Sequence, residues 1–405
     1  MYKLILNLFA EVQVTTQPSL SAEMKTFYDM RLIDEASPML VHEQFGQKRP
    51  IPQGSGKTIE FRKFSPLPKA LVPLTEGVTP SGNSLEVTNM TATVEQFGDF
   101  IVQSDVLELT AIDNTILEAT KLLGRQAGLT MDTIVRNVMN SGTNVSYAPK
   151  ISGSTETEVT SRKDLDKTAK LTVDVVQRIV AKLRAQNAPT INGDYVAIIH
   201  PYVAYDLMRD PEWIDAHKYS TPENIYTGEI GKIGGVRFVQ STEAKIFAPK
   251  IKGKVKTAVS SAGTSITVEG NLPTMTGVSV PCYLGGNINT ITAIAEASDG
   301  VYTVTLGTAA TAAVGDILVD REGTADGLAV FSCLFLGDGA YGVTEVTGGG
   351  LQTIIKQKGS AGTADPLDQR SSVGWKGLKT AKILVDNYLV RCEVCSRYSD
   401  TASAN

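Results

Sequence analysis

Residues 58–97 read TIEFRKFSPLPKALVPLTEGVTPSGNSLEVTNMTATVEQF, and this stretch decides the architecture. Its first residues alternate between apolar and polar, and Met90, Ala92 and Val94 fall on one face near its other end. Both patterns predict half-buried strands, and the prolines and glycines between them predict an irregular tip. A two-stranded hairpin is marginal in water, and its unpaired edges invite another chain. We therefore predict a long arm, residues 48–100, that is completed by a neighbouring copy.

The composition is that of a soluble globular chain, long enough for two or three packed units. The 405 residues are 42% hydrophobic and 20% charged, with 38 Lys and Arg against 43 Asp and Glu. This mildly acidic balance argues against a protein built to grip nucleic acid. No stretch reaches the roughly 18 apolar residues of a membrane span, and residues 4–10 are too short for a signal peptide. Four cysteines form no disulfide framework in so long a chain, so we expect a reduced, cytoplasmic folding environment.

The rest of the chain mixes helical and strand patterns, which predicts an α+β fold. The main elements are a short helix over residues 23–35 capped by Ser21, a long helix over 104–140, a helix ending near 187, a buried strand over 195–199, a helix over 202–209 opened by His200 and Pro201, and strands near 236–239, 330–336 and 382–395. Between Lys256 and Arg321 there is no Lys or Arg, and short alternations rich in Thr, Gly and Ala predict a small all-β insertion with an acidic surface.

Two motifs imitate chemical sites. The run from Gly54 to Thr58 resembles the end of a phosphate-binding loop, but the required first glycine is Ile51 and a strand pattern follows instead of a helix. Cys392 and Cys395 have the spacing of half a zinc site, yet residues three apart on a strand point to opposite faces and no second pair exists. We interpret the first as a flexible turn and the second as core thiols, and expect no metal and no cofactor.

Two further groups carry weak chemical alternatives. His200 with Asp206 or Asp210 is the only candidate for a hydrolase, and a role for His200 at the start of a helix is favoured over a catalytic one. The alternating Lys250, Lys252, Lys254 and Lys256 suit nucleic-acid contact or, as we favour, the protection of an edge strand against unwanted pairing. Nothing in the sequence argues for an enzyme.

Three blocks in this order resemble the major capsid proteins of tailed bacteriophages. They are residues 74–80 (LTEGVTP), the stretch from His200-Pro201-Tyr202 through Trp213 to residues 223–231 (ENIYTGEIG), and residues 365–376 (DPLDQRSSVGWK). The branch that the sequence resembles most is the coat proteins of podophages that carry a virion RNA polymerase. The resemblance covers nearly everything except residues 251–327, and it implies the capsid-shell fold that tailed phages share with herpesviruses.

The resemblance implies a division into domains. Residues 1–47 would be an N-terminal arm and 48–100 the extended loop (E-loop). Residues 101–190 and 365–405 would form the peripheral domain, with the long helix as its spine, and 191–250 and 328–364 the axial domain. Residues 251–327 are the all-β insertion, which a minimal capsid subunit lacks and which we expect on the outer face of the shell.

The predicted function is self-assembly into hexamers and pentamers of an icosahedral phage head that encloses double-stranded DNA without reading its sequence. On the extended loop, Phe61, Phe64, Leu71 and Leu74 should pack against the spine region of an adjacent subunit, and Arg62, Lys63 and Glu76 should form ion pairs across the contact. A Phe64→Asp change should leave soluble subunits but few closed shells.

The family also implies partners: a separate scaffolding protein, a portal and, in some members, a decoration protein. The expected location is the virion capsid, after assembly in the host cytoplasm. A phage tail or surface structural protein with a β-sandwich insertion is the alternative function, and the hydrolase is a more distant one.

Overall fold

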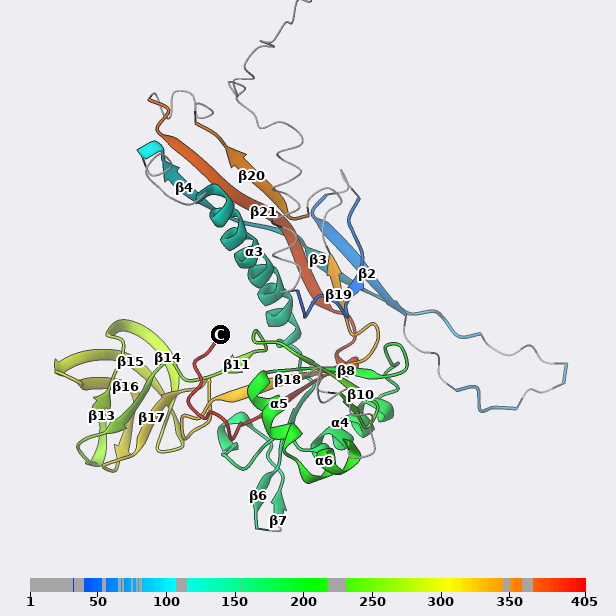
Figure 1. Cartoon of the computed structure of the whole chain (residues 1–405). Helices are drawn as coiled ribbons and strands as arrows, with labels where there is room; N and C mark the ends of the chain where they lie inside the picture. Colours follow the sequence, from blue (N-terminus) through cyan, green and yellow to red (C-terminus); the bar gives the residue numbers. More distant parts are fainter. Residues whose placement is uncertain are drawn as a thin grey trace, which may run out of the picture.

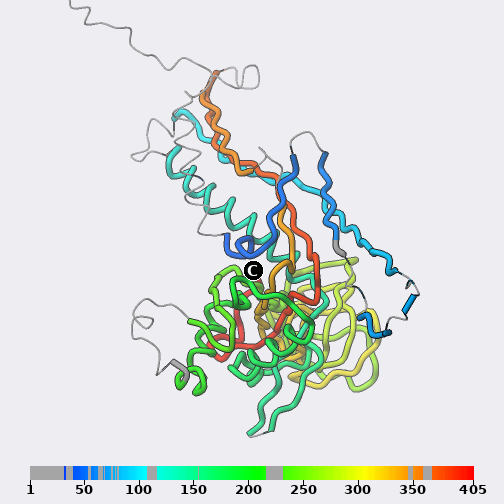
Figure 2. Tube along the Cα trace, turned by 90° about the vertical axis from the view of Figure 1, so that its right-hand side faces the viewer, coloured from blue at the N-terminus to red at the C-terminus, as the bar shows by residue number. Residues whose placement is uncertain are grey.

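The computed structural model describes residues 32, 40–52, 56–64, 67, 69–73, 76, 77, 79, 82–106, 115–153, 155–217, 231–344, 350–358 and 367–405. These residues form four parts: an arm, a long sheet with one long helix, a compact α/β body, and a small barrel (Figures 1 and 2). The predicted helix over 23–35 and its cap lie outside the described residues, apart from Leu32, which is helical and buried.

The arm is a hairpin of β2 (Thr58–Phe64) and β3 (Val87–Thr93), in register from Thr58 opposite Thr93 to Phe64 opposite Val87. The alternation has the predicted consequence: the paired residues Phe61 and Met90, and their neighbours Ile59 and Ala92, lie on one face. Within the described residues these two strands pair with no third strand.

A long sheet lies next to the arm. Its strands are β4 (Glu95–Ser104), β20 (Gln352–Lys356), β21 (Arg370–Ile383), β19 (Tyr341–Thr344) and β1 (Gln47–Lys48). The long helix α3 (Thr115–Met139) covers one face of the sheet (Figure 1). Leu123, Ala127 and Met131 on α3 pack against Val373 and Trp375 on β21. Residue 104, where the helix was predicted to begin, ends β4, and residues 107–114 lie outside the described part of the chain.

The compact body is built on a sheet in the order β5-β22-β18-β8-β10-β9, with β11 beside β18. The strands are β5 (Val145–Tyr147), β22 (Leu389–Val394), β18 (Val330–Leu336), β8 (Tyr195–Ile199), β10 (Val236–Gln240), β9 (Lys232–Ile233) and β11 (Ile246–Phe247). Its helices are α4 (Val173–Ala185), α5 (Pro201–Met208) and α6 (Pro211–His217). Every residue of β8 is buried, because its alternate side chains enter two different cores: Tyr195 packs with the helices, and Val196 packs against the end of α3.

The barrel is closed, in the order β12-β13-β16-β15-β14-β17. Its strands are β12 (Lys252–Val255), β13 (Val259–Gly270), β14 (Met275–Leu284), β15 (Asn287–Ser298), β16 (Val301–Ala312) and β17 (Ile317–Asp320). Fourteen buried residues form its own core, among them Val268, Ile291 and Val304. The barrel therefore has what the arm lacks, which is a closed sheet around an apolar interior.

The lysine alternation is explained differently from the prediction. Lys252 and Lys254 point outward while Gly253 and Val255 are buried, but β12 pairs with β13 on one side and with β17 on the other. It is not an edge strand, so the edge-protection explanation is wrong. The outer placement of the insertion was expected because the sequence predicts an acidic surface that is free of lysine. Since Lys252 and Lys254 lie on the barrel, its surface is not free of lysine, and the expected placement loses that support.

The cores do not follow the predicted boundary at residue 190. One core unites residues from 148 to 188 and from 390 to 395 with residues 195–248 and 329–335. Thus α4 and β22, which were assigned with the long helix, belong to the compact body. Local periodicity identifies a strand or helix correctly but carries no information about which sheet it joins.

Candidate subunit-contact site

The root of the arm is fastened to the chain's own body by Phe61. The side chain of Phe61 is only 3% exposed. It lies over Gly342 of β19, where an added Cβ would come within 2.7 Å of the ring, and the Arg49 guanidinium stands 5.8 Å from the ring centroid. Phe61 was predicted to pack against a neighbouring subunit. In the structure Phe61 packs inside its own subunit, so it is not part of the proposed contact surface.

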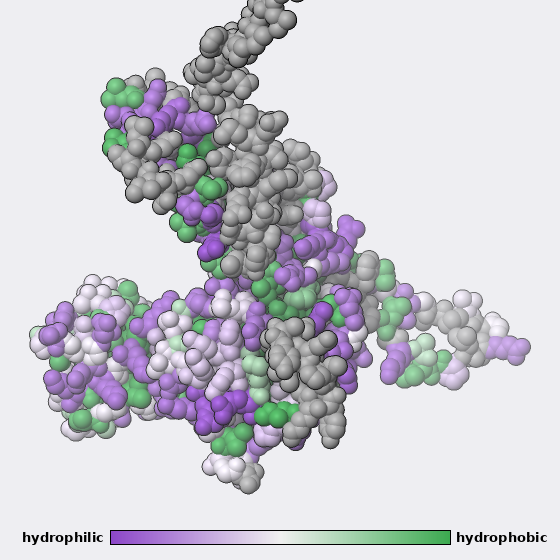
Figure 3. Space-filling model, in the orientation of Figure 1, coloured by the Kyte–Doolittle hydropathy of each residue, from purple (hydrophilic) through white to green (hydrophobic). Residues whose placement is uncertain are grey.

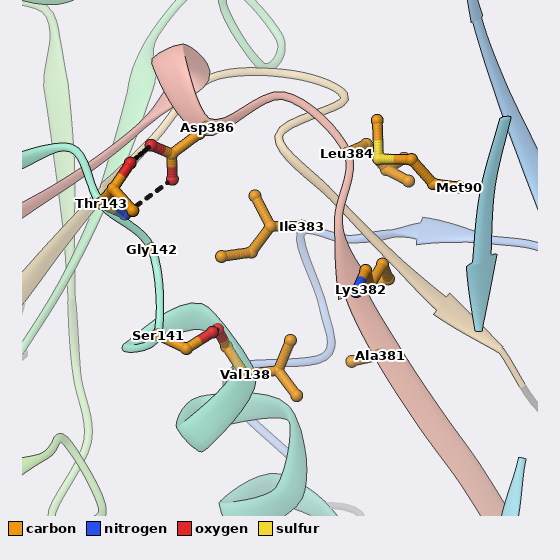
Figure 4. A pocket seen from close by; sticks show the side chains of 10 residues that line it. All are labelled: Met90, Val138, Ser141, Gly142, Thr143, Ala381, Lys382, Ile383, Leu384 and Asp386. Carbon is orange, nitrogen blue, oxygen red and sulfur yellow. Dashed lines mark hydrogen bonds between the residues drawn. The ribbon is translucent and has the colours of Figure 1, made fainter. Parts of the chain in front are cut away.

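A cavity of about 600 Å³ lies beside this root (Figure 4). Its apolar lining comes from Met90 of the arm, Val138 at the end of α3, Ile383 at the end of β21 and the following Leu384. Asp386 accepts hydrogen bonds from the backbone N–H of Thr143, at 3.0 Å, and from its hydroxyl. The arm thus adjoins the body across an open space, with the buried Phe61 as an aromatic anchor.

Beyond the root, the arm exposes apolar side chains. Leu71 is 80% exposed and Val72 is 85% exposed, and Leu67, Leu85 and Val87 are also exposed. Figure 3 shows apolar atoms along this projecting segment. Of the predicted charged residues, Arg62 and Glu76 are exposed; the side chains of Lys63 and Phe64, and the whole of Leu74, lie outside the described part. Sequence reasoning missed Val72 and Leu85, because an irregular tip has no periodicity to reveal which side chains are left uncovered.

A second exposed apolar surface lies on the long sheet, on the face away from α3. Phe100 is 66% exposed, Val102 52% and Ile354 38%. Phe100, Gly374 and Ile354 form one row across β4, β21 and β20. A Cβ on Gly374 would come within 2.7 Å of Phe100 Cβ, so glycine allows the close approach. We call Phe100, Val102 and Ile354 the sheet patch.

The alternation along β4 fixes this orientation. Asp99, next to Phe100, points to the helix side, where its Oδ2 accepts a 2.6 Å hydrogen bond from Gln126 of α3. That bond, with a second one from the Phe100 N–H, lowers the pKa of Asp99. Phe97 and Ile101 likewise pack toward α3. The sheet patch is therefore the outward face of a sheet whose other face is already covered.

Residues 40–49 connect α3, β19 and β21, and no pattern in the sequence predicts this role. We call residues 40–49 the strap. The Asp132 carboxylate of α3 accepts hydrogen bonds from the backbone N–H and from Nδ1 of His42, at 2.7 and 2.6 Å, and both side chains are fully buried. Glu43 pairs with Lys379 of β21 at 2.6 Å, and the Tyr341 hydroxyl donates to the His42 carbonyl. The strap holds α3, β21 and β19 in one unit.

The residues of the hydrolase alternative have structural roles. His200 Nδ1 accepts from the N–H of Tyr202 at the start of α5, and burial lowers the pKa of His200. Asp206 accepts from Ser396, and Asp210 accepts from the N–H of Val173 at the start of α4. His200 and Asp210 thus accept from N–H groups at the starts of helices, and Asp206 holds α5 against the segment after β22.

The cysteines are buried thiols. All four are free and buried, and burial raises the pKa of Cys392 and of Cys395 to about 12. The described residues contain no cluster of His, Cys, Asp and Glu that could hold a metal ion. None of their helices is long and apolar enough to cross a membrane.

Three features together define a self-assembling structural protein. They are the incomplete arm, the uncovered sheet patch on the same chain, and a mixed α/β body that carries both. Residues 41–359 match the family described as phage capsid protein, and the chain belongs to that family. It is a phage major capsid protein that assembles as capsomers into the icosahedral head, and its place is the virion capsid. This confirms the predicted structural, non-enzymatic role and decides against the tail and hydrolase alternatives.

The fold is similar to that of several phage capsid structures. The capsid subunit of cyanophage Pam1 has a TM-score of 0.56 and 11% identity, with 100% of both chains covered. That of Ralstonia phage GP4 has a TM-score of 0.54 and 12% identity, with 98% of this chain and 99% of the other covered. That of cyanophage P-SCSP1u has a TM-score of 0.53 and 13% identity, with 97% of this chain and 94% of the other covered. At such identities the likeness shows the fold alone. No curated protein matches the chain.

Proposed function

We propose that the arm of one subunit lies across the sheet patch of an adjacent subunit and that this contact joins subunits in the shell. The observation that carries the proposal is the presence, on one chain, of two exposed apolar surfaces of different shape. One is a projecting hairpin bearing Leu71 and Val72, and the other is a flat sheet face bearing Phe100 and Val102. Contacts between unlike surfaces generate rings when the rotation between neighbouring subunits closes.

The expected strength of one such contact is modest. Covering a leucine or valine side chain contributes about 1.5–3 kcal/mol, so a few such side chains supply only part of a stable interface. Many copies in a closed shell then add their contacts through multivalency. Phe64 and Leu74 would extend the apolar surface, and Arg62, Lys63 and Glu76 would form ion pairs at its rim. Exposed ion pairs contribute about 0–1 kcal/mol, so they would fix the register more than the strength.

The test is a charge placed on the arm. The double change Leu71→Asp with Val72→Asp should leave a folded, soluble subunit but few closed shells by electron microscopy. Val314→Asp is the matched control, because Val314 is 67% exposed on the barrel. This control variant should assemble like the parent protein. Normal shells from the arm variant would overturn the arm assignment.

The cores also support a division into capsid domains. The arm corresponds to the extended loop, and the long sheet with α3 corresponds to the peripheral domain. The compact body, including α4 and β22, corresponds to the axial domain, and the closed barrel would be the insertion. Under this assignment the predicted ranges 101–190 and 365–405 are each divided between the peripheral and axial domains.

The wider assembly follows the same family. We infer hexamers and pentamers around double-stranded DNA, held without sequence-specific contact, as the net charge of −5 suits. A scaffolding protein, a portal and a decoration protein are the inferred partners, and podophages carrying a virion RNA polymerase the inferred branch. Expression with and without the neighbouring phage genes, followed by cryo-EM, tests each partner.

A further inference from the structure

The compact body carries an exposed aromatic surface that the arm contact does not use. Tyr205 and Met208 on α5 and Tyr398 near the end of the chain are 36%, 41% and 59% exposed. The rings of Tyr205 and Tyr398 lie 5.4 Å apart, and Tyr398 also packs on Tyr202 at 4.5 Å. Arg209 Nη1 donates a 2.7 Å hydrogen bond to the Tyr205 hydroxyl. We call Tyr205, Met208, Tyr398 and Arg209 the aromatic patch.

The aromatic patch is held rigidly from below. Asp206, which is buried, accepts 2.8 Å hydrogen bonds from the Ser396 hydroxyl and from the N–H of Arg397. The N–H of Tyr398 in turn donates to the Ser396 hydroxyl at 3.1 Å. Tyr398 is thereby fixed against α5 before any partner arrives. Tyr, Met and Arg are the residues enriched at protein interfaces, and preorganised side chains lose little entropy on binding.

A second hairpin on the same body is tied to it by side chains: the Ile151 N–H donates to the Thr168 hydroxyl at 3.0 Å, and Arg178 of α4 pairs with Glu156. The strands β6 (Lys150–Ser152) and β7 (Thr155–Thr157) project from the body (Figure 1) and, among the described residues, pair only with each other. Ile151 is 37% exposed on this hairpin. Like the arm, a lone hairpin is marginal unless something covers it.

The charges of the hairpin and of the aromatic patch are opposite. Glu156 and Glu158 are exposed on and just after β7. Arg178 pairs with both Glu156 and Asp174, and Glu158 adds a third carboxylate. Lys150 on β6 and Arg178 offset two of these three charges, so the hairpin and its root keep one negative charge. Arg209 and Arg397 are exposed in and beside the aromatic patch. Apolar Ile151 would meet Tyr and Met side chains, and the glutamates would meet the arginines.

We propose that the β6–β7 hairpin of one subunit docks on the aromatic patch of the next subunit around a capsomer. A ring of identical subunits requires two different, complementary surfaces on each copy, and the compact body presents these two. The contact rests on assembly into capsomers, and it is separate from the contact between the arm and the sheet patch. Hairpin and aromatic patch hold the ring together, whether or not the arm acts as proposed.

Disulfide trapping tests the contact. The chain's own cysteines are all buried, so Ile151→Cys and Tyr398→Cys introduced together supply the only exposed thiols. Oxidised shells should give a ladder of covalent multimers on a non-reducing gel. The pair Val314→Cys with Tyr398→Cys is the control and should give none. Shells without a ladder from the first pair, or subunits closed on themselves, would overturn the proposal.

Reversing the charges on the two sides tests the same contact during assembly, without a crosslink. Arg397→Glu should lower the yield of capsomers by roughly tenfold, the effect of about 1.4 kcal/mol, and Glu158→Arg in the same chain should restore it. Thermal unfolding checks that both variants fold. An unchanged yield from Arg397→Glu, or no restoration by the second change, contradicts the pairing. An arm variant that also carries Ile151→Cys and Tyr398→Cys should lose closed shells, while its oxidised capsomers should still give the ladder. Failure of the two contacts is therefore distinguishable.

Discussion

The arm and the barrel are both all-β excursions from one α/β subunit, yet only one of them is complete. The barrel closes six strands on one another and buries its own core, with Val268, Ile291 and Val304 at 0% exposure. The arm has two strands, and its tip leaves Leu71 at 80% and Val72 at 85% exposure. The difference teaches that closure of the sheet, and not its apolar content, decides whether a β excursion needs a neighbour.

The two regions also differ at their roots. The arm is anchored through Phe61 beside an open cavity. The barrel is anchored near a buried charge: Arg162 donates to Glu393 from Nε at 2.7 Å and from Nη2 at 2.6 Å, and from Nη1 to the Glu322 carbonyl just after β17. The N–H of Ala325 donates to the Lys163 carbonyl close by. The barrel is therefore expected to move with the body, and the arm to move against it.

The largest effect should come from shortening the arm. Phe64 and Val87 are opposite each other, so residues 65–86 can be replaced by Asn-Gly, which favours a tight hairpin turn. The subunit should fold, because the deleted residues contribute nothing to its described cores, but closed shells should disappear. Electron microscopy and size-exclusion chromatography measure both outcomes. Abundant shells would show that the barrel, or another surface, carries the assembly contact.

The next effect concerns the anchor of the barrel. Glu393→Gln leaves Arg162 with an uncompensated charge beside a fully buried side chain, and breaking such a pair costs about 3–5 kcal/mol. Denaturant unfolding should show this loss for the body. The exposed Arg178–Glu156 pair is the matched control, and Glu156→Gln should change stability by less than about 1 kcal/mol. Equal effects would mean that burial of the ion pair is not what matters.

A more local effect should follow Phe61→Ala. Removing a buried phenylalanine costs about 3–5 kcal/mol, and here the loss falls on the docking of the arm root and not on the main cores. Hydrogen exchange of β2 and β3 should accelerate, while that of β8 stays protected. Arg62→Ala, the exposed neighbour on the same strand, should leave exchange unchanged. Global unfolding instead of local opening would show that the arm is an integral part of the body.

The smallest effect should come from removing the barrel. Asp320 Oδ2 already accepts from the N–H groups of Lys250 and Ile251, at 2.8 and 3.0 Å, so the two ends of the excursion touch. Replacing residues 252–319 by two glycines should therefore leave the body folded and the shells unchanged in number. Circular dichroism and electron microscopy measure this. Loss of shells would make the barrel an assembly element equal to the arm.

The sequence by itself determined the local elements and the class of protein. Alternation placed Phe61 and Met90 on strands, and the strand pattern after Gly54 argued against a phosphate-binding loop. Three ordered motifs led to the capsid family. These features depend only on residues close together in the sequence, because strand and helix periodicity is a local property of the chain.

Only the tertiary structure decided what covers each face. In the folded chain Phe61 faces inward over Gly342, and β22 belongs to the compact body. Lys252 and Lys254 lie on a strand that is paired on both sides. The tertiary structure also brought His42 to Asp132, 90 residues away, and left Phe100 and Tyr398 uncovered. A pattern shows that a strand has an apolar face; only long-range packing selects the neighbour that buries it, or leaves it for another subunit.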